Sequence, residues 1–110
     1  MPTAYPYLRV SSDEQMVSTQ LEQIRRYWEL TLKDTMELGE AWADEDVSGG
    51  VKFTTRPSAG RLMLKVDRGD AIIISKLDRG FRNTRDCLEV VEVLQARKVQ
   101  LHILDLHIHD

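Results

Sequence analysis

Apolar residues along this chain occur in short runs that are separated by polar or helical stretches. The runs at residues 4 to 10, 38 to 42, 70 to 75 and 99 to 105 are predicted to be strands, and the third is almost continuously apolar. Such a continuous run is typical of a strand that is covered on both faces. Pro6 lacks a backbone donor, so we expect the first strand to fit poorly at the centre of a sheet.

A helix is predicted from about residue 13 to residue 32, directly after the first strand. Ser12 followed three residues later by Gln15 has the form of a capping box at its start. The apolar residues of its buried face recur at helical spacing: Val17, Leu21, Ile24 and Trp28.

Two further helices are predicted, each with a polar residue as its cap. Ser58 would cap a short helix that Gly69 ends, and its apolar residues are Leu62, Met63 and Val66. Thr84 would cap a longer helix, whose buried side would carry Leu88, Val91, Leu94 and Gln95. The stretch from Asp44 to Ser58 is polar and contains two adjacent glycines, so we expect a mobile loop there.

These elements follow one another in the order β-α-β-α-β-α-β, within a chain whose 110 residues suffice for one domain. Alternation of this kind predicts a three-layer α/β fold, with a mainly parallel four- to five-stranded sheet and helices on both faces. Ligands of such folds bind beyond the carboxyl ends of the strands. Candidate chemistry is therefore sought where the predicted strands end.

Composition and charge narrow the function. The net charge of −3 argues against a free-standing DNA binder, although Lys76 to Arg85 holds four positive residues and one Asp, which makes one face locally basic. The apolar runs are too short for a membrane span and no signal peptide precedes them. The single cysteine cannot form an internal disulfide, so we expect a cytoplasmic protein.

Two clusters of reactive side chains leave the ends of predicted strands. Arg9 and Ser11 end the first strand, and Asp78, Arg79 and Arg82 follow the third. A serine hydroxyl is a poor nucleophile unless the charge that it generates is stabilised. Arginines suit the attack on a phosphodiester, because a guanidinium stays charged and donates in a planar fork. Arg9, Arg56, Arg79 and Arg82 would supply this stabilisation without a metal.

Together with Asp44 through Gly49 and Arg56-Pro57, these clusters resemble the catalytic domain of the serine recombinases, the resolvase and invertase family. The resemblance implies that Ser11 attacks DNA, becomes joined to the 5′ phosphate and frees a 3′ hydroxyl before the exchanged ends are religated. Gly80-Phe81 departs from the commoner Leu-Gly of the family, although both arginines of its Leu-Asp-Arg-x-x-Arg signature are kept.

The resemblance also assigns individual roles. Arg9, Arg56, Asp78, Arg79 and Arg82 match catalytic positions, while the supporting positions are matched by Gln20, Asp44, Ser48 and Gly49. Asp78 would either orient an arginine or transfer a proton. No cofactor or metal is implied. Residues 1 to 110 would be a fragment, and the full-length protein would bind DNA as a homodimer or tetramer.

Several plainer interpretations remain. The plainer interpretation of Ser11 is that it merely caps the first helix, because a serine between a strand and a helix is a cap more often than a nucleophile. Cys87 is expected to be a small core residue. His102, His107, His109, Asp105 and Asp110 lack the spacing of a metal site. The alternative function is a non-catalytic, degenerate recombinase-like module that binds protein partners or an anion. Convergence of Ser11 and the arginines on one pocket would distinguish the two.

Overall fold

The structure is a computed structural model that describes residues 1 to 10 and 14 to 105. Its strands form one five-stranded sheet in which every pair is parallel. The strands are β1 (Thr3–Val10), β2 (Glu37–Leu38), β3 (Trp42–Glu45), β4 (Ala71–Ile74) and β5 (Gln100–Ile103). The helices are α1 (Glu14–Thr31), the 3-10 turn η1 (Phe53–Thr55), α2 (Pro57–Lys65), α3 (Leu77–Gly80) and α4 (Thr84–Ala96).

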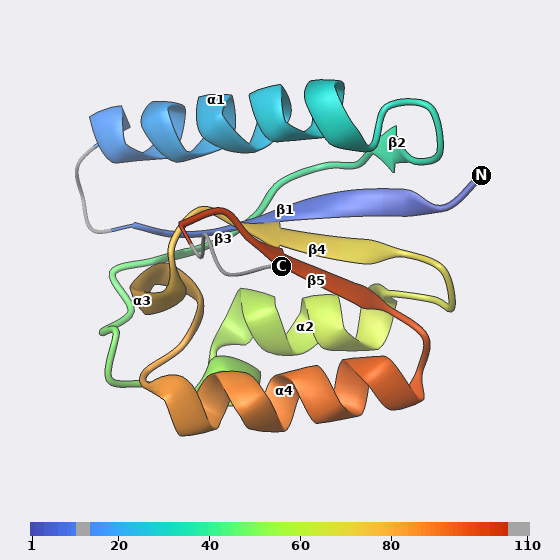
Figure 1. The fold of residues 1–110 in the computed structure, drawn as a ribbon. Helices are drawn as coiled ribbons and strands as arrows, with labels where there is room; N and C mark the ends of the chain where they lie inside the picture. The colour runs from blue at the N-terminus through green and yellow to red at the C-terminus, as the bar shows by residue number, and fades with distance from the viewer. Residues whose placement is uncertain (11–13, 106–110) are drawn as a thin grey trace.

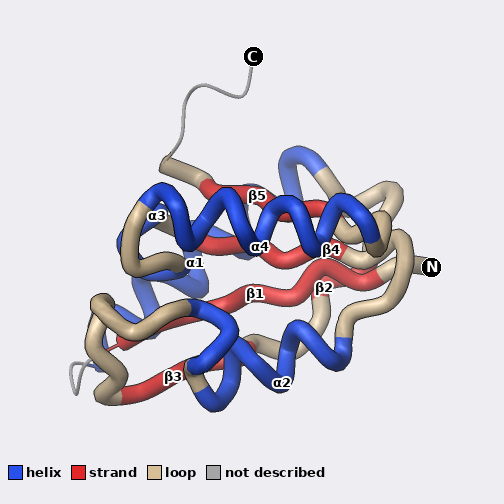
Figure 2. The backbone as a smooth tube through the Cα atoms, turned by 90° about the horizontal axis from the view of Figure 1, so that it is seen from below, coloured by secondary structure: helices blue, strands red, loops and turns tan. Residues whose placement is uncertain are grey.

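The sheet lies between two helical layers, which confirms the predicted three-layer α/β fold. Helix α1 covers one face, and α2 and α4 cover the other (Figure 1). From below, α4 crosses β4 and β5 while α2 runs beside β1 and β3 (Figure 2). Successive residues of β1 point to opposite faces, so Tyr7 packs in the cluster beneath α2 and α4 and Leu8 packs beneath α1.

Strand β1 is central in spite of Pro6, and a break in its neighbour explains how. β2 pairs with Thr3 and Ala4, whereas β3 pairs with β1 only from Tyr7 onward. The carbonyls of Ala4 and Val10 accept hydrogen bonds from Gly39 and Asp46, so the even residues of β1 face this side. The backbone nitrogen of Pro6, which carries no hydrogen, therefore faces the gap between β2 and β3. No strand pairs with β1 on that side at this position, so the sheet needs no hydrogen-bond donor there.

The second predicted strand is divided and extends further than residues 38 to 42. β2 ends at Leu38, and β3 continues to Glu45. The loop expected over residues 44 to 58 is therefore wrong at both ends, because it begins inside β3 and ends inside α2. Its middle is anchored as well, since Phe53 in η1 is fully buried.

Both helix caps predicted in the second half of the chain are displaced by neighbouring residues. Arg56 is the N-cap of α2, so Ser58 lies within the helix, and α2 ends at Lys65 before Gly69 is reached. Asn83 rather than Thr84 caps α4, because its side chain accepts a hydrogen bond from the Asp86 amide. The capping box at Ser12 lies outside the described residues.

The buried faces of α1 and α4 were predicted in part. Ile24 is fully buried, but Leu21 is 37% exposed and the neighbouring Gln20 is buried instead. On α4, Leu94 is buried, whereas Leu88 is 61% exposed and Gln95 is also exposed. The buried positions of α4 are Asp86, Cys87, Val90 and Leu94. The last strand is shorter than residues 99 to 105, because β5 ends at Ile103.

Candidate active site

The carboxyl ends of β1, β3 and β4 meet at one edge of the sheet and bring together residues from distant parts of the sequence. Arg9 is the next-to-last residue of β1 and lies opposite Asp44 of β3. Helix α3, which contains Asp78 and Arg79, follows β4. The predicted nucleophile Ser11 lies outside the described residues. In sequence it directly follows Val10, the last residue of β1.

Arg9 reaches from β1 to the loop after β3 and to helix α3. Its Nη1 donates to the Val47 carbonyl at 3.2 Å and its Nη2 to the Asp78 carbonyl at 3.3 Å. The buried Nε has no hydrogen-bond partner among the described residues. Burial, followed by the positive charges of Arg79 and Arg56, lowers the pKa of Arg9, and Asp78 opposes this effect. Around this guanidinium the effects of burial and positive charge thus outweigh that of the Asp78 carboxylate.

Gly49 allows this placement. A Cβ at Gly49 would lie 3.1 Å from the Arg9 Nη2, which is closer than ordinary contact, so a side chain there would press on the guanidinium. Ser48 has an exposed hydroxyl that accepts the Gly50 amide at 3.1 Å, and its carbonyl accepts the Val51 amide. The Ser-Gly pair of the predicted site therefore forms a turn against Arg9.

Arg56 is an interior residue with only 1% of its surface exposed. It donates to three backbone carbonyls, those of Val51 at 3.0 Å, Gly49 at 3.4 Å and Arg79 at 2.8 Å. In the described part of the chain it forms no ion pair with a carboxylate, so carbonyl dipoles stabilise the buried charge. Its contacts tie the turn at Gly49 to α3.

Tyr7 is a site residue that the sequence interpretation missed. Its hydroxyl donates to Asp44 Oδ2 at 2.8 Å and accepts from Arg56 Nη1 at 3.3 Å. The side chain is fully buried, and burial is the main reason that the pKa of Tyr7 is raised well above its usual value. A signal was present, because Tyr7 and Arg9 are two residues apart on one strand and so share a face.

Asp44 joins β3 to the start of α2. Its Oδ1 accepts the Ser58 amide at 2.8 Å, and its Oδ2 accepts the Ala59 amide at 3.0 Å as well as the Tyr7 hydroxyl. A carboxylate at a helix N-terminus is favourable, because the first amides lack intrahelical partners and carry partial positive charge. Asp44 is thus an anchor for α2 and, through Tyr7, for Arg56.

Two side chains meet at the carbonyl of Arg9. Gln20 Nε2 donates to this oxygen at 3.3 Å from α1, and Arg79 Nη1 donates at 3.4 Å from α3. Gln20 is 5% exposed, and its Oε1 has no partner within the described residues. Both faces of the sheet therefore contribute to fixing the end of β1 immediately before Ser11.

Arg79 and Arg82 do not share a helical face. α3 ends at Gly80, and Phe81 has an extended backbone with φ of −138° and ψ of 153°. Arg82 is exposed, and within the described residues its guanidinium makes no hydrogen bond or ion pair. Asp78 is exposed too and contributes its carbonyl to Arg9. Hydrogen bonds thus link Arg9, Arg56 and Arg79 to one another, whereas none among the described residues links Arg82 to them.

Packing explains the Gly80-Phe81 departure from the family pattern. A Cβ at Gly80 would lie 2.6 Å from Ile74 Cδ1, so α3 rests directly on β4. Phe81 is 2% exposed and stacks against Phe53 with ring centroids 5.1 Å apart. The large side chain is therefore one position later than in the common pattern, and it is buried at that position.

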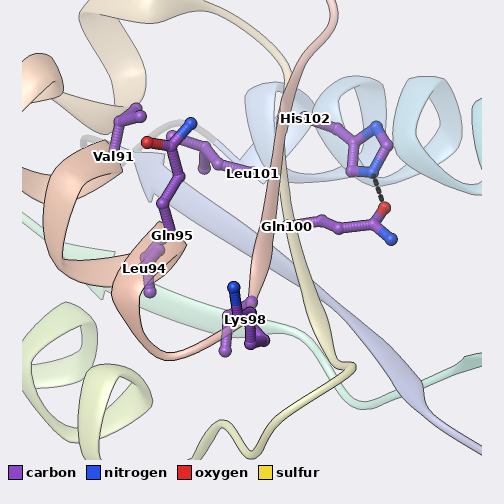
Figure 3. A pocket seen from close by; sticks show the side chains of 8 residues that line it. Val91, Leu94, Gln95, Lys98, Gln100, Leu101 and His102 are labelled. Atoms are coloured by element: carbon purple, nitrogen blue, oxygen red, sulfur yellow. Dashed lines mark hydrogen bonds between the residues drawn. The ribbon is translucent and has the colours of Figure 1, made fainter.

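Other candidate groups lie away from this cluster. Cys87 is buried, and burial raises the pKa of its thiol, which confirms it as a core residue. A groove of about 650 Å³ runs between α4 and β5, where His102 pairs with Gln100 at 2.8 Å (Figure 3). None of the described site residues lines it.

Neither a metal-binding cluster nor a membrane-spanning helix is found among the described residues. They contain no group of three His, Cys, Asp or Glu side chains that could hold a metal ion, and His107, His109 and Asp110 lie outside them. None of the described helices has both the length and the apolar character needed to cross a membrane.

Known proteins resemble this chain over most of its length. The Tn2501 transposon resolvase of Escherichia coli is 31% identical over 106 residues, covering 96% of this chain and 52% of the relative. Serine recombinase PinR of Escherichia coli K12 is 28% identical, covering 96% of this chain and 51% of the relative. This chain therefore spans about half the length of the curated relatives that it matches.

Solved structures share the fold. The N-terminal catalytic domain of TP901-1 integrase superposes with a TM-score of 0.74 and 25% identity, covering 94% of this chain and 77% of that chain. The C-terminal catalytic domain of ISC1926 TnpA, an IS607-like serine recombinase, has a TM-score of 0.69 at 22% identity, covering 93% and 70% of the two chains. The family model for the resolvase N-terminal domain matches residues 4–110, and the chain belongs to this serine recombinase family.

Proposed function

We propose that this chain is the catalytic domain of a serine site-specific recombinase that cleaves and rejoins DNA. The observation that carries the proposal is the gathering of Arg9, Arg56 and Arg79 at the end of β1, directly before Ser11 in sequence. A phosphodiester placed there would meet concentrated positive charge next to a hydroxyl nucleophile.

In the proposed reaction, the Ser11 oxygen attacks phosphorus and forms a Ser–O–P bond. The bond from phosphorus to the 3′ oxygen breaks, and the proton lost by Ser11 is balanced by the one gained by the 3′ hydroxyl. The free 3′ hydroxyl of an exchanged end then reverses the reaction. No nucleotide cofactor is required, because the phosphoserine ester conserves the bond energy.

The electrostatics favour this chemistry. Arg9 is destabilised in its charged form by burial and by two neighbouring arginines. An anionic phosphate would relieve that repulsion, and the further charge that develops in the transition state would relieve it more. We propose that Arg9 and Arg79 contact the phosphate and that Arg82, which is exposed, approaches it from the solvent side.

The remaining predicted residues are assigned positioning roles. Arg56 is too deeply buried for direct contact, and we propose that it aligns α3 through the Arg79 carbonyl. Asp44 aligns Arg56 through Tyr7, Gln20 aligns the end of β1, and Ser48 shapes the turn beside Arg9. Asp78 would either orient an arginine or transfer a proton.

We further propose that residues 1 to 110 form one domain of a longer cytoplasmic protein that acts on DNA as a homodimer or tetramer. The relatives are about twice as long as this chain, which supports the presence of further segments. The alternative is a non-catalytic module, and the observation that favours it is that no hydrogen bond among the described residues links Arg82 to the other arginines.

The test is formation of a covalent protein–DNA adduct by the full-length protein with its recombination site. We expect an adduct at the 5′ phosphate from the parent and none from Ser11→Ala. Ser12→Ala is the matched control and should retain the adduct. A parent that binds the site but forms no adduct would favour the non-catalytic module, and an adduct formed by Ser11→Ala at the parental rate would exclude Ser11 as nucleophile.

A further inference from the structure

Helix α3 carries Arg79 but is too short to be stable by itself. It contains four residues, and its N-cap Lys76 makes no capping hydrogen bond with its side chain. A single helical turn is unfavourable in isolation, because several dihedral angles are fixed for few hydrogen bonds. The orientation of Arg79 must therefore depend on contacts that come from outside α3.

Two of these contacts hold the carbonyl end of α3. Arg9 Nη2 donates to the Asp78 carbonyl, and Arg56 Nη1 donates to the Arg79 carbonyl. Both donors are positively charged, which suits the partial negative charge of exposed helical carbonyls. They do not hold the other end of the helix, where the amides point outward.

The amide end of α3 is held by a carboxylate from the segment that follows β5. Asp105 Oδ1 accepts the Leu77 amide at 3.1 Å across 28 positions of sequence. Asp105 reaches this amide because the Leu104 amide donates to the Ile74 carbonyl at 3.0 Å, which keeps the exits of β4 and β5 together. Figure 1 shows the end of β5 arriving beside α3.

We propose that Asp105 is a positioning residue whose carboxylate fixes the N-terminus of α3 and thereby the Arg79 guanidinium for attack on the phosphodiester. This inference rests on the proposed function. The charges are complementary along the short helix, with a carboxylate at its amide end and guanidinium groups at its carbonyl end. Loss of the carboxylate would leave only one end of α3 fixed.

The first test is the single-turnover rate of DNA cleavage by the full-length protein. Asp105→Ala should lower this rate by about 10- to 100-fold, because small displacements of a positioned catalytic group have effects of that size. The dissociation constant for the site should change less than twofold. Asp105→Asn should recover most of the rate, because its amide oxygen can still accept the Leu77 amide. Asp34→Ala removes an exposed carboxylate in the turn after α1 and is the charge-matched control.

The second test needs no DNA. Hydrogen exchange of the Leu77 amide in this chain should accelerate in Asp105→Ala and stay near the parental rate in Asp105→Asn. Leu77→Pro and Asp105→Ala together form a double-mutant cycle. Leu77→Pro removes the donor of the hydrogen bond at the first helical position, where proline is tolerated. In the Leu77→Pro background, Asp105→Ala should have almost no further effect on cleavage, because the hydrogen bond is already absent.

The outcomes separate this inference from the proposed function. A parent that forms no covalent adduct would overturn both. A parent that forms the adduct, with Asp105→Ala cleaving at the parental rate or with unchanged exchange at Leu77, would overturn the role of Asp105 alone. Additive losses in the double variant would overturn it as well. If Asp105→Ala fails to fold, Leu77→Pro alone carries the comparison, because it removes the same hydrogen bond from the donor side, and Leu77→Ala, which keeps the amide, is its control. Equal cleavage rates of Leu77→Pro and Leu77→Ala would then overturn the role of Asp105.

Discussion

Replacement of Tyr7 by phenylalanine tests how much the buried hydrogen-bond network of Tyr7, Asp44 and Arg56 contributes to the free energy of unfolding. The change removes one hydroxyl and leaves the ring packed against Phe53, whose centroid lies 5.1 Å away. Asp44 loses a donor at 2.8 Å and Arg56 loses an acceptor at 3.3 Å. The substitution therefore isolates the polar contribution of the network from its apolar packing.

The expected loss follows from these contacts. A hydrogen bond to a charged group contributes about 1.5 to 3 kcal/mol, and a long one contributes less. Asp44 Oδ2 keeps the Ala59 amide and Arg56 Nη1 keeps the Arg79 carbonyl, so neither atom is left unpaired. We therefore expect Tyr7→Phe to lower the free energy of unfolding by about 2 kcal/mol, near the low end for two contacts. The melting temperature should fall by about 8 °C.

Tyr5 provides a matched control. It lies two residues earlier on the same face of β1, and its hydroxyl makes no hydrogen bond within the described residues. Tyr5→Phe should change stability by less than about 0.5 kcal/mol. Urea denaturation followed by circular dichroism measures all three proteins. Equal stabilities of Tyr7→Phe and Tyr5→Phe would refute the energetic role of the network.

Three further predictions follow from the same structure. Because burial raises the pKa of Tyr7, the folded state keeps that proton above pH 10 while the unfolded chain loses it, so the stability of the parent should fall faster than that of Tyr7→Phe as pH rises above about 10. Gly80→Ala should destabilise by about 1 to 3 kcal/mol, and Ile74→Val in the same chain should restore part of the loss by removing the Cδ1 atom that the new methyl meets; equal losses with and without Ile74→Val would contradict the packing argument. This chain alone should bind DNA more weakly than about 10⁻⁶ M, as measured by fluorescence anisotropy at physiological salt, because its net charge is −3 and Arg56 is buried; sub-micromolar, site-specific binding would contradict this expectation.

The sequence predicted the layered fold because burial on both faces leaves a clear pattern. β4 reads as Ala-Ile-Ile-Ile, and all of its residues are buried. The strand exits at Arg9 and at Lys76 were placed correctly for the same reason. Cap positions failed by one or two residues, because Ser58 and Thr84 have close competitors in Arg56-Pro57 and Asn83, and local sequence alone does not rank them.

The roles of residues within the site were harder to predict, because they depend on how deeply each side chain is buried. Arg56 and Arg82 look alike in the sequence, yet one is 1% exposed and the other lies on the surface. Composition carries no signal for that difference. The link from Asp105 to Leu77 was also beyond prediction, since it requires the exits of two strands to lie side by side. Such contacts depend on the register of the sheet, which periodicity does not give.

The carbonyl groups that bind Arg56 link the stability of this domain to its proposed catalysis. Arg56 donates hydrogen bonds to three backbone carbonyls and not to a carboxylate. These bonds fix the turn at Gly49 and the position of α3 without neutralising the positive charge of the site. A carboxylate partner would stabilise the buried charge more strongly, but it would also reduce the positive potential that a phosphate needs. A substitution that places a carboxylate beside Arg56 should therefore lower the rate at which the full-length protein forms the covalent DNA adduct, even where the fold is intact.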